Sequence, residues 1–168
     1  MANPDSTDIN SLDDHSMIQA FIDEHRQILM TCLDGLSESE ARAKLVDSKT
    51  TLLGLVKHAT FVERVWFGEA ATGTSRSDLG LVATPDESFV LEAADTIESI
   101  QHSYARAIEE SRQVIKGKTG DDIFPGNRRG PLPLRWVLLH MLRELAQHCG
   151  HADILREQIL AARKPSAS

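Results

Sequence analysis

Apolar residues recur along most of the chain at the three- and four-residue spacing of an α-helix. Four long segments show this pattern, near residues 13–34, 51–71, 89–115 and 132–161. Strict alternation of apolar and polar residues, the pattern of a half-buried strand, is rare. The sequence therefore predicts an all-α protein with four long helices.

Each segment carries a face of apolar positions, which we expect to pack into the core. In the first segment this face comprises Met17, Ile18, Phe21, Ile22, Ile28, Leu29 and Cys32. In the third segment it comprises Ala93, Ile97, Ile100, Tyr104, Ile108 and Ile115.

Local signals predict where several helices begin and end. Gly35 follows the first apolar segment, as is typical of a helix C-terminus. Ser37 and Glu40 have the spacing of a capping box, which predicts a short helix through about Leu45. Pro133 suits the first turn of the last helix, where its missing N–H is not needed.

Two long polar segments separate the later helices, at residues 72–88 and 117–133. The first exceeds the usual connection, so it is functional, mobile or wrapped over the helices. Four amphipathic helices bury their faces most simply as a four-helix bundle. We therefore expect one bundle domain over residues 12–163 with long crossover connections, between disordered tails at 1–11 and 164–168.

Composition and charge narrow the range of partners. The chain has 168 residues, is 41% hydrophobic and carries a formal net charge of -7. Without a basic block it is a poor match for nucleic acid, whose phosphates attract Lys and Arg. No stretch approaches the roughly 20 apolar residues of a membrane helix. The polar, acidic N-terminus lacks the features of a secretory signal, so we expect a cytoplasmic protein.

The two cysteines, Cys32 and Cys149, fall in different predicted helices. A cytoplasmic setting disfavours a structural disulfide between them. We expect two reduced, buried thiols.

A stripe of polar residues runs along the last helix, on the side that should face the core. Relative to His140, a turn of 100° per residue places Glu144 about 40°, His148 about 80° and His151 about 20° round the helix. Burying such groups without partners costs several kcal/mol. They must therefore pair with one another, with water or with a cation. Imidazole and carboxylate groups spaced three or four residues apart can hold one divalent ion from a single helix.

A metal site would need at least one more ligand from another helix. His58 lies on the apolar face of the second segment, between Leu55 and Val62. His25 is a rival on the first segment, whereas His15 and His102 have the surroundings of surface residues. These patterns leave two interpretations of His58 open, a metal ligand and a hydrogen-bonded core residue.

Two motifs resemble a known family. "TLLGLVKHATFVERVWFGE" (51–69) and "LRWVLLHMLRELAQHCGHADILRE" (134–157) are similar to the DinB-like superfamily. The nearer resemblance is to its actinobacterial branch of uncharacterised proteins, which is related to mycothiol-dependent maleylpyruvate isomerase. The resemblance extends over residues 17–159 and implies a four-helix bundle with a long crossover.

The resemblance also implies a divalent metal, zinc or alternatively nickel, held by three side chains. It assigns the ligand roles to His58, Glu144 and His148. Many relatives have histidine where this chain has Glu144, and the isomerase-like branch has glutamate. His151 would be a fourth ligand, or would contact a metal-bound water or thiol.

In function, the resemblance implies a transferase or isomerase that uses a low-molecular-weight thiol such as mycothiol and an electrophilic substrate. Three protein ligands and an open position are typical of a catalytic metal. Arg143, Arg156 and the pair Arg128–Arg129 could hold carboxylates, or could be solvated surface residues. Two alternatives remain: a non-catalytic metal- or small-molecule-binding protein of a stress response, and a bundle whose polar stripe is a metal-free hydrogen-bond network. The sequence leaves open whether the protein is a homodimer.

Overall fold

A computed structural model describes residues 12–163, and the tails predicted at 1–11 and 164–168 lie outside this range. Helices make up most of the described chain, and its one sheet has two strands of two residues each, which confirms the all-α prediction. Its four long helices are α1 (Asp14–Thr31), α3 (Leu52–Arg64), α5 (Ile97–Ile115) and α6 (Leu134–Ala161). The short elements are α2 (Glu38–Ala41), the π-helical turn η2 (Val65–Glu69), α4 (Ala70–Thr72), the 3₁₀ turn η3 (Glu87–Phe89), β1 (Ile123–Phe124) and β2 (Leu132–Pro133).

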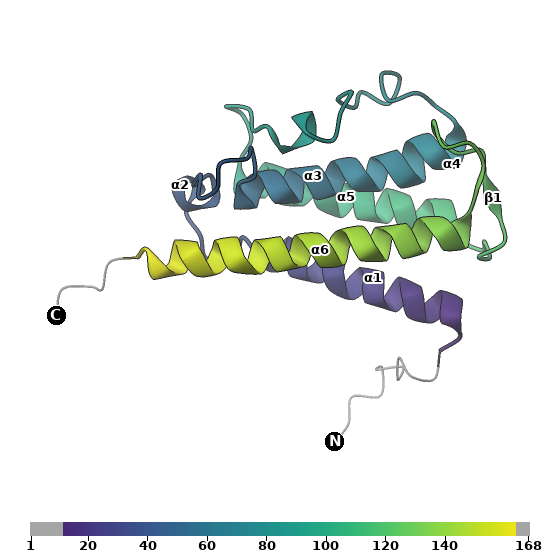
Figure 1. Ribbon diagram of the computed structural model, residues 1–168, viewed down its shortest axis with the longest axis horizontal. Helices are drawn as coiled ribbons and strands as arrows, with labels where there is room; N and C mark the ends of the chain where they lie inside the picture. The colour runs from purple at the N-terminus through teal and green to yellow at the C-terminus, as the bar shows by residue number, and fades with distance from the viewer. Residues whose placement is uncertain (1–11, 164–168) are drawn as a thin grey trace.

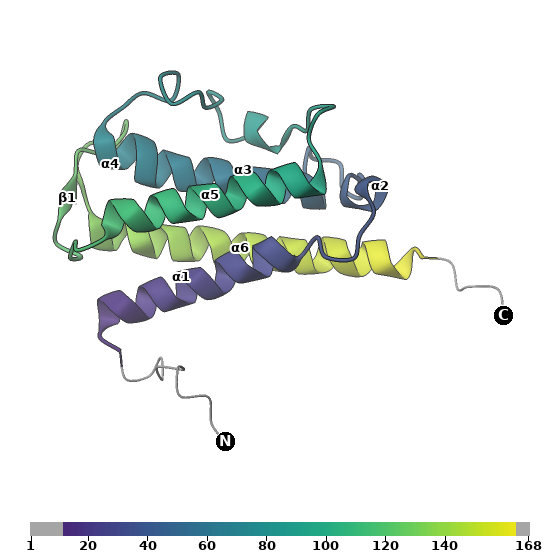
Figure 2. The same ribbon diagram turned by 180° about the vertical axis from the view of Figure 1, so that it is seen from behind.

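The long helices form a four-helix bundle (Figures 1 and 2). Helix α1 packs against α6, and α3 packs against both α5 and α6. Leucine side chains fill much of the space between them, and the fully buried ones are Leu29, Leu33, Leu52, Leu53, Leu55, Leu134, Leu138 and Leu145. Among residues 12–163, no helix combines the length and the apolar character that crossing a membrane requires.

Helix α3 is buried on almost every side. The Thr51 side chain caps it by accepting a hydrogen bond from the Gly54 backbone N–H at 3.0 Å. Between Leu52 and Glu63, only Lys57 is not buried. The segment 73–96 passes over the side of α3 that faces away from α1, as Figure 1 shows. A helix that is buried on almost every side needs such a cover.

The third long helix begins later than its pattern suggested. It starts at Ile97 rather than near Phe89, because Thr96 and Ser99 form a capping box at its N-terminus. Ala93 therefore lies outside the helix, and Phe89 belongs to the turn η3. The connection between α4 and α5 is correspondingly longer than expected.

The buried face of α1 also differs from the prediction. Phe21 and Ile28 are exposed, whereas Arg26 is buried. The Arg26 guanidinium donates two hydrogen bonds of 2.8 Å to the carboxylate of Glu63, which is fully buried. The Ser111 hydroxyl of α5 donates to the same carboxylate at 2.7 Å. A charged residue occupies this core position because its partner is buried with it.

The remaining boundaries differ by a few residues. Helix α2 has the predicted capping box between Ser37 and Glu40, but it ends at Ala41. Pro133 is the N-cap of α6 rather than a residue of its first turn, and it pairs with Ile123 in the small antiparallel hairpin.

Candidate metal centre

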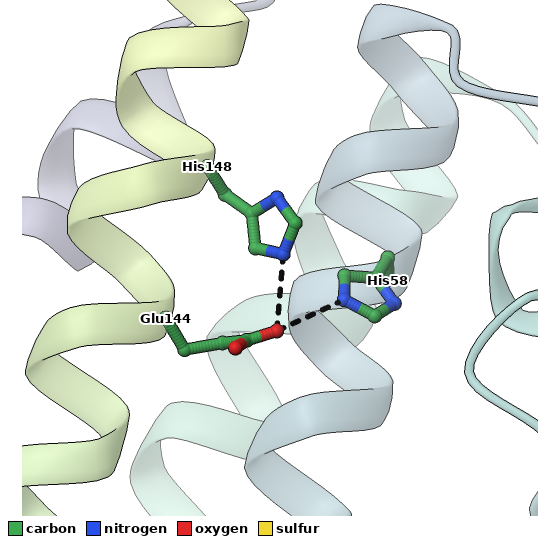
Figure 3. A group of neighbouring side chains, drawn as sticks. All are labelled: His58, Glu144 and His148. Atoms are coloured by element: carbon green, nitrogen blue, oxygen red, sulfur yellow. Dashed lines mark hydrogen bonds and ion pairs between the residues drawn. The ribbon is translucent and has the colours of Figure 1, made fainter. Parts of the chain in front are cut away.

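Three predicted ligand residues meet between α3 and α6. Glu144 and His148 are one turn apart on α6, and His58 faces them from α3 (Figure 3). One oxygen, Glu144 Oε1, lies 3.1 Å from His148 Nε2 and 3.5 Å from His58 Nε2. The structure thus brings together residues that are 86 positions apart in the chain.

The spacing of these atoms fits a single metal ion. One nitrogen or oxygen from each of the three residues lies within 4.8 Å of the other two. Two ligands of tetrahedral zinc, each about 2.0–2.1 Å from the metal, lie about 3.3 Å apart. The two distances to Glu144, 3.1 and 3.5 Å, bracket this value. Small side-chain adjustments would therefore suffice to bind one ion.

Charge in the cluster also suits a cation. Contact with His148, and then with His58, holds the pKa of Glu144 well below its ordinary value, although partial burial opposes this. Burial lowers the pKa of His58, against the opposing effect of Glu144. Near neutral pH the cluster thus combines a carboxylate with a neutral His58 ring. A neutral imidazole and a carboxylate are the protonation states that bind metal.

His148 has one buried polar atom without a partner. Its Nδ1 and the Tyr104 hydroxyl are the two buried side-chain nitrogen or oxygen atoms in residues 12–163 that lack a hydrogen bond. Histidine ligands usually use their second ring nitrogen as a donor to a neighbouring group. The second nitrogen of His58 has such a partner, since its Nδ1 lies 2.7 Å from Ser88 Oγ. The second ring nitrogen of His58 therefore has a hydrogen-bond partner, whereas that of His148 has none.

A cavity of about 190 Å³ opens beside the cluster. His58 and Glu144 form part of its wall, together with Phe61, Val62, Val65, Trp66, Arg76, Pro85, Asn127, Arg128, Arg129 and His140. The segment between β1 and β2 brings Arg128 and Arg129 to this wall. Gly126 anchors that segment by donating its backbone N–H to the Ala70 carbonyl at 2.8 Å. Its φ of 85° and the adjacent Gly130 backbone leave no room for a side chain.

His140 supplies a second imidazole to the cavity wall. Its ring stacks on Trp136 at 5.1 Å with an angle of 6°, and Arg143 Nη2 lies 2.9 Å from its Nδ1. Arginine only donates, so Nδ1 accepts and the ring proton lies on Nε2. Burial lowers the pKa of His140 against the opposing effect of Glu144, and the neighbouring Arg143 and Arg129 lower it further. His140 is therefore a neutral hydrogen-bond donor next to the cluster.

His151 lies outside the three-residue cluster. Its side chain is exposed, and its ring centre is 5.6 Å from that of His148. It lines a separate hollow of about 260 Å³ with residues that include Val46 and Ile154. The rival His25 is also elsewhere, with its Nδ1 2.6 Å from the Phe21 carbonyl oxygen of its own helix.

The predicted arginines have different surroundings. Arg128 and Arg129 reach the cavity beside the cluster, and Arg143 bonds to His140. Arg156 instead donates to the backbone carbonyl oxygens of Cys32 and Asp34, at 2.6 and 2.9 Å. Its guanidinium thus fastens the end of α1 to α6 rather than facing the cluster.

Both cysteines are free and buried, as expected. The Cys149 thiol points to α1, where it donates to the His25 carbonyl oxygen at 3.4 Å. Burial raises the pKa of Cys149 to about 11 and that of Cys32 to about 12. Since the thiolate is the reactive form, neither thiol is prepared for chemistry near neutral pH.

Three residues around the cluster were not singled out from the sequence. Ser88 and Phe89 contact the His58 ring, and Arg76 lines the cavity while bound to Glu69 at 2.8 Å. Arg76 and Ser88 lie outside the four predicted helices, and Phe89 lies at the start of the third one. The unusual length of the segment after α4 was the only signal in the sequence that pointed to them.

Comparison with known proteins gives one family. The family model described as mycothiol-S-transferase matches residues 17–161. This agrees with the mycothiol-related branch indicated by the two sequence motifs. No curated protein matches the chain.

Proposed function

Because the chain belongs to the mycothiol-S-transferase family, we propose that it is a metal-dependent enzyme that transfers a mycothiol-type thiol to an electrophile. His58, Glu144 and His148 are the proposed ligands of one divalent metal, with zinc preferred and nickel as the alternative. The cytoplasm, where small thiols are kept reduced, is the proposed setting.

One observation carries the proposal: three ligand-type side chains converge, and two of them, His58 and Glu144, line a cavity. Three ligands leave an open coordination position, as in catalytic zinc sites. Two neutral imidazoles and one carboxylate leave a net charge of about +1 on a bound divalent ion. When bound, the metal would stabilise the thiol as its thiolate, the nucleophilic form.

The residues of the chain have separate roles in this proposal. Arg128 and Arg129 give the cavity wall positive charge, which favours a substrate with an anionic group. His140 can donate a hydrogen bond to substrate from the same wall. In a transfer, the thiol loses its proton, a sulfur–carbon bond forms, and the leaving group departs with its electron pair. In an isomerisation, the sulfur–carbon bond forms and later breaks, which regenerates the thiol. His151 is proposed only as a supporting residue or fourth ligand.

Measurements of metal content and of turnover also test two other functions. A non-catalytic protein that binds a metal or a small molecule would use the same three ligands without turnover. A metal-free network would rest on the direct contacts of 3.1 and 3.5 Å to Glu144, and it requires both imidazoles to donate to that oxygen from Nε2.

Metal content of protein purified without a histidine tag tests the ligand assignment. We expect about one zinc or nickel ion per chain, lost in His148→Ala and His58→Ala because each removes one of three ligands. His102→Ala, an exposed histidine on α5, is the matched control and should retain the metal. Metal-free wild-type protein that also fails to take up added zinc would support the hydrogen-bond network instead.

Turnover separates the enzyme from a binding protein. The metal-loaded protein should consume mycothiol together with an electrophile, followed as loss of free thiol. His58→Ala should reduce the rate to that of the uncatalysed reaction. Metal binding without any thiol consumption above this variant, across a panel of thiols and electrophiles, would support the non-catalytic alternative.

A further inference from the structure

The long connection after α4 contacts His58 through the turn η3 and, just before it, through the Pro85 backbone. In η3, Ser88 Oγ lies 2.7 Å from His58 Nδ1, and the Phe89 ring stacks on the imidazole at 4.0 Å with an angle of 12°. Ser88 is 3% exposed and His58 is 3% exposed, so both contacts are shielded from water. Ser88 thus bonds to the edge of the imidazole, and Phe89 packs on its face.

The hydrogen bonds of Ser88 locate the proton on the His58 ring. The Ser88 hydroxyl donates to the Pro85 carbonyl oxygen at 2.5 Å. A serine has one hydroxyl proton, so its oxygen can only accept from His58 Nδ1. The ring proton of neutral His58 therefore lies on Nδ1, and the lone pair of Nε2 faces Glu144. A lone pair facing a carboxylate oxygen at 3.5 Å is unfavourable unless a cation lies between them.

Helix α3 is shaped to receive this turn. The turn lies over Gly54, one helical turn before His58. A Cβ atom on Gly54 would lie 2.6 Å from the Phe89 carbonyl oxygen, closer than real Cβ contacts. Because glycine is unfavourable inside a helix by up to about 1 kcal/mol relative to alanine, its presence here has a packing cause. Gly54 allows Ser88 and Phe89 to reach the imidazole.

We infer that η3 is a positioning device for His58: Ser88 fixes the ring proton on Nδ1, Phe89 fixes the ring plane, and together they keep Nε2 ready to bind metal. This inference rests on the proposed function for the identity of the bound ion. It assigns to the segment 73–96 a role in metal affinity, beyond covering α3. Ser88 is a positioning residue, since it acts through His58 and does not reach Glu144 or His148.

The first test measures zinc affinity by competition with a chromophoric chelator. Loss of a partner to a ligand histidine typically weakens metal binding by about 10- to 100-fold, which is the result expected for Ser88→Ala. Ser88→Thr, which keeps the hydroxyl, should restore much of the affinity. Ser103→Ala is the matched control, because Ser103 lines the same cavity of about 710 Å³ as Ser88 but lies on α5. It should bind zinc as the wild type does.

Gly54→Ala provides a variant that alters neither a ligand nor Ser88. Its methyl group should displace the Phe89 backbone and lift η3 from α3. We expect zinc affinity to fall as in Ser88→Ala, while circular dichroism retains the helical signal. Wild-type affinity in both Ser88→Ala and Gly54→Ala would overturn the inference.

Nitrogen NMR of the imidazole gives a second readout that needs no metal. In the metal-free full-length protein, His58 should be protonated on Nδ1, and Ser88→Ala should give a mixture of tautomers. Protonation on Nε2 in the wild type would overturn the inference even if zinc binds. Conversely, Nδ1 protonation in a protein that binds no metal would leave the positioning role of Ser88 standing and would overturn the proposed function alone.

Discussion

Glu144 is the residue on which the candidate site depends most. It is the one carboxylate between two imidazoles, and both contacts are made by the same oxygen. The contacts with His148 and His58 that depress its pKa keep it charged across the physiological range. Glutamine at this position would preserve the shape while removing the charge that attracts a cation.

The protonation of His58 predicts how stability depends on pH. Its pKa is lowered by burial from 6.5, so just below pH 6.5 the unfolded chain binds more protons than the folded one. The free energy of unfolding should therefore decrease as pH falls from about 6.5 to the folded-state pKa of His58. Glu144, whose pKa is depressed below 4.5, should add a further loss at lower pH.

Urea denaturation of metal-free protein between about pH 5 and pH 8 measures this effect in the range where histidine titrates. His58→Gln removes the group, so the difference in stability between wild type and variant should shrink as the pH falls. A difference that stays constant with pH would contradict a buried, neutral His58.

At the scale of elements, the bundle is joined by a buried ion pair as well as by apolar packing. Arg26 of α1, Glu63 of α3 and Ser111 of α5 form one hydrogen-bonded group. Such a group contributes little net energy relative to apolar residues, but it is costly to break on one side.

Substitution of one partner should therefore lower the free energy of unfolding more than substitution of both partners. Glu63→Leu leaves the Arg26 charge buried and should lower the free energy of unfolding by about 3–5 kcal/mol. Combining it with Arg26→Met should recover a large part of this loss. Urea denaturation of the two single variants and the double variant measures the coupling, and additive losses would contradict the pairing.

At the scale of the whole molecule, a metal would link the two halves of the bundle. His58 belongs to α3, which packs on α5, while Glu144 and His148 belong to α6, which packs on α1. An ion bound to all three would hold α3 and α6 together. Since only the folded chain brings these ligands together, binding should stabilise the fold.

We predict that zinc raises the melting temperature. At a free concentration of 100 times Kd, the gain is about 2.7 kcal/mol, which corresponds to roughly 5–10 °C for a chain of this size. Thermal denaturation with zinc and with a chelator measures the shift. It should vanish in His148→Ala and persist in His102→Ala; an equal shift in both variants would show that zinc binds elsewhere.

Much of the architecture followed from the sequence, because the direction of a side chain on a helix depends only on its position in the helical repeat. This repeat predicted the four helices and placed Glu144 and His148 on one side of the last one. On α1, however, the repeat predicted the buried residues less well. Phe21 and Ile28 are exposed, while the charged Arg26 is buried beside Glu63.

The helices and the polar stripe on α6 were determined by the sequence alone, through local periodicity and capping. The family resemblance implied that His58 meets Glu144, but only the tertiary structure decided the geometry of that contact and that Ser88, 30 residues further along the chain, holds the His58 ring. Ser88 lies in a segment without periodicity, so no local rule determines its direction. Its contact depends on how the segment 73–96 packs on α3, which is a property of the whole fold.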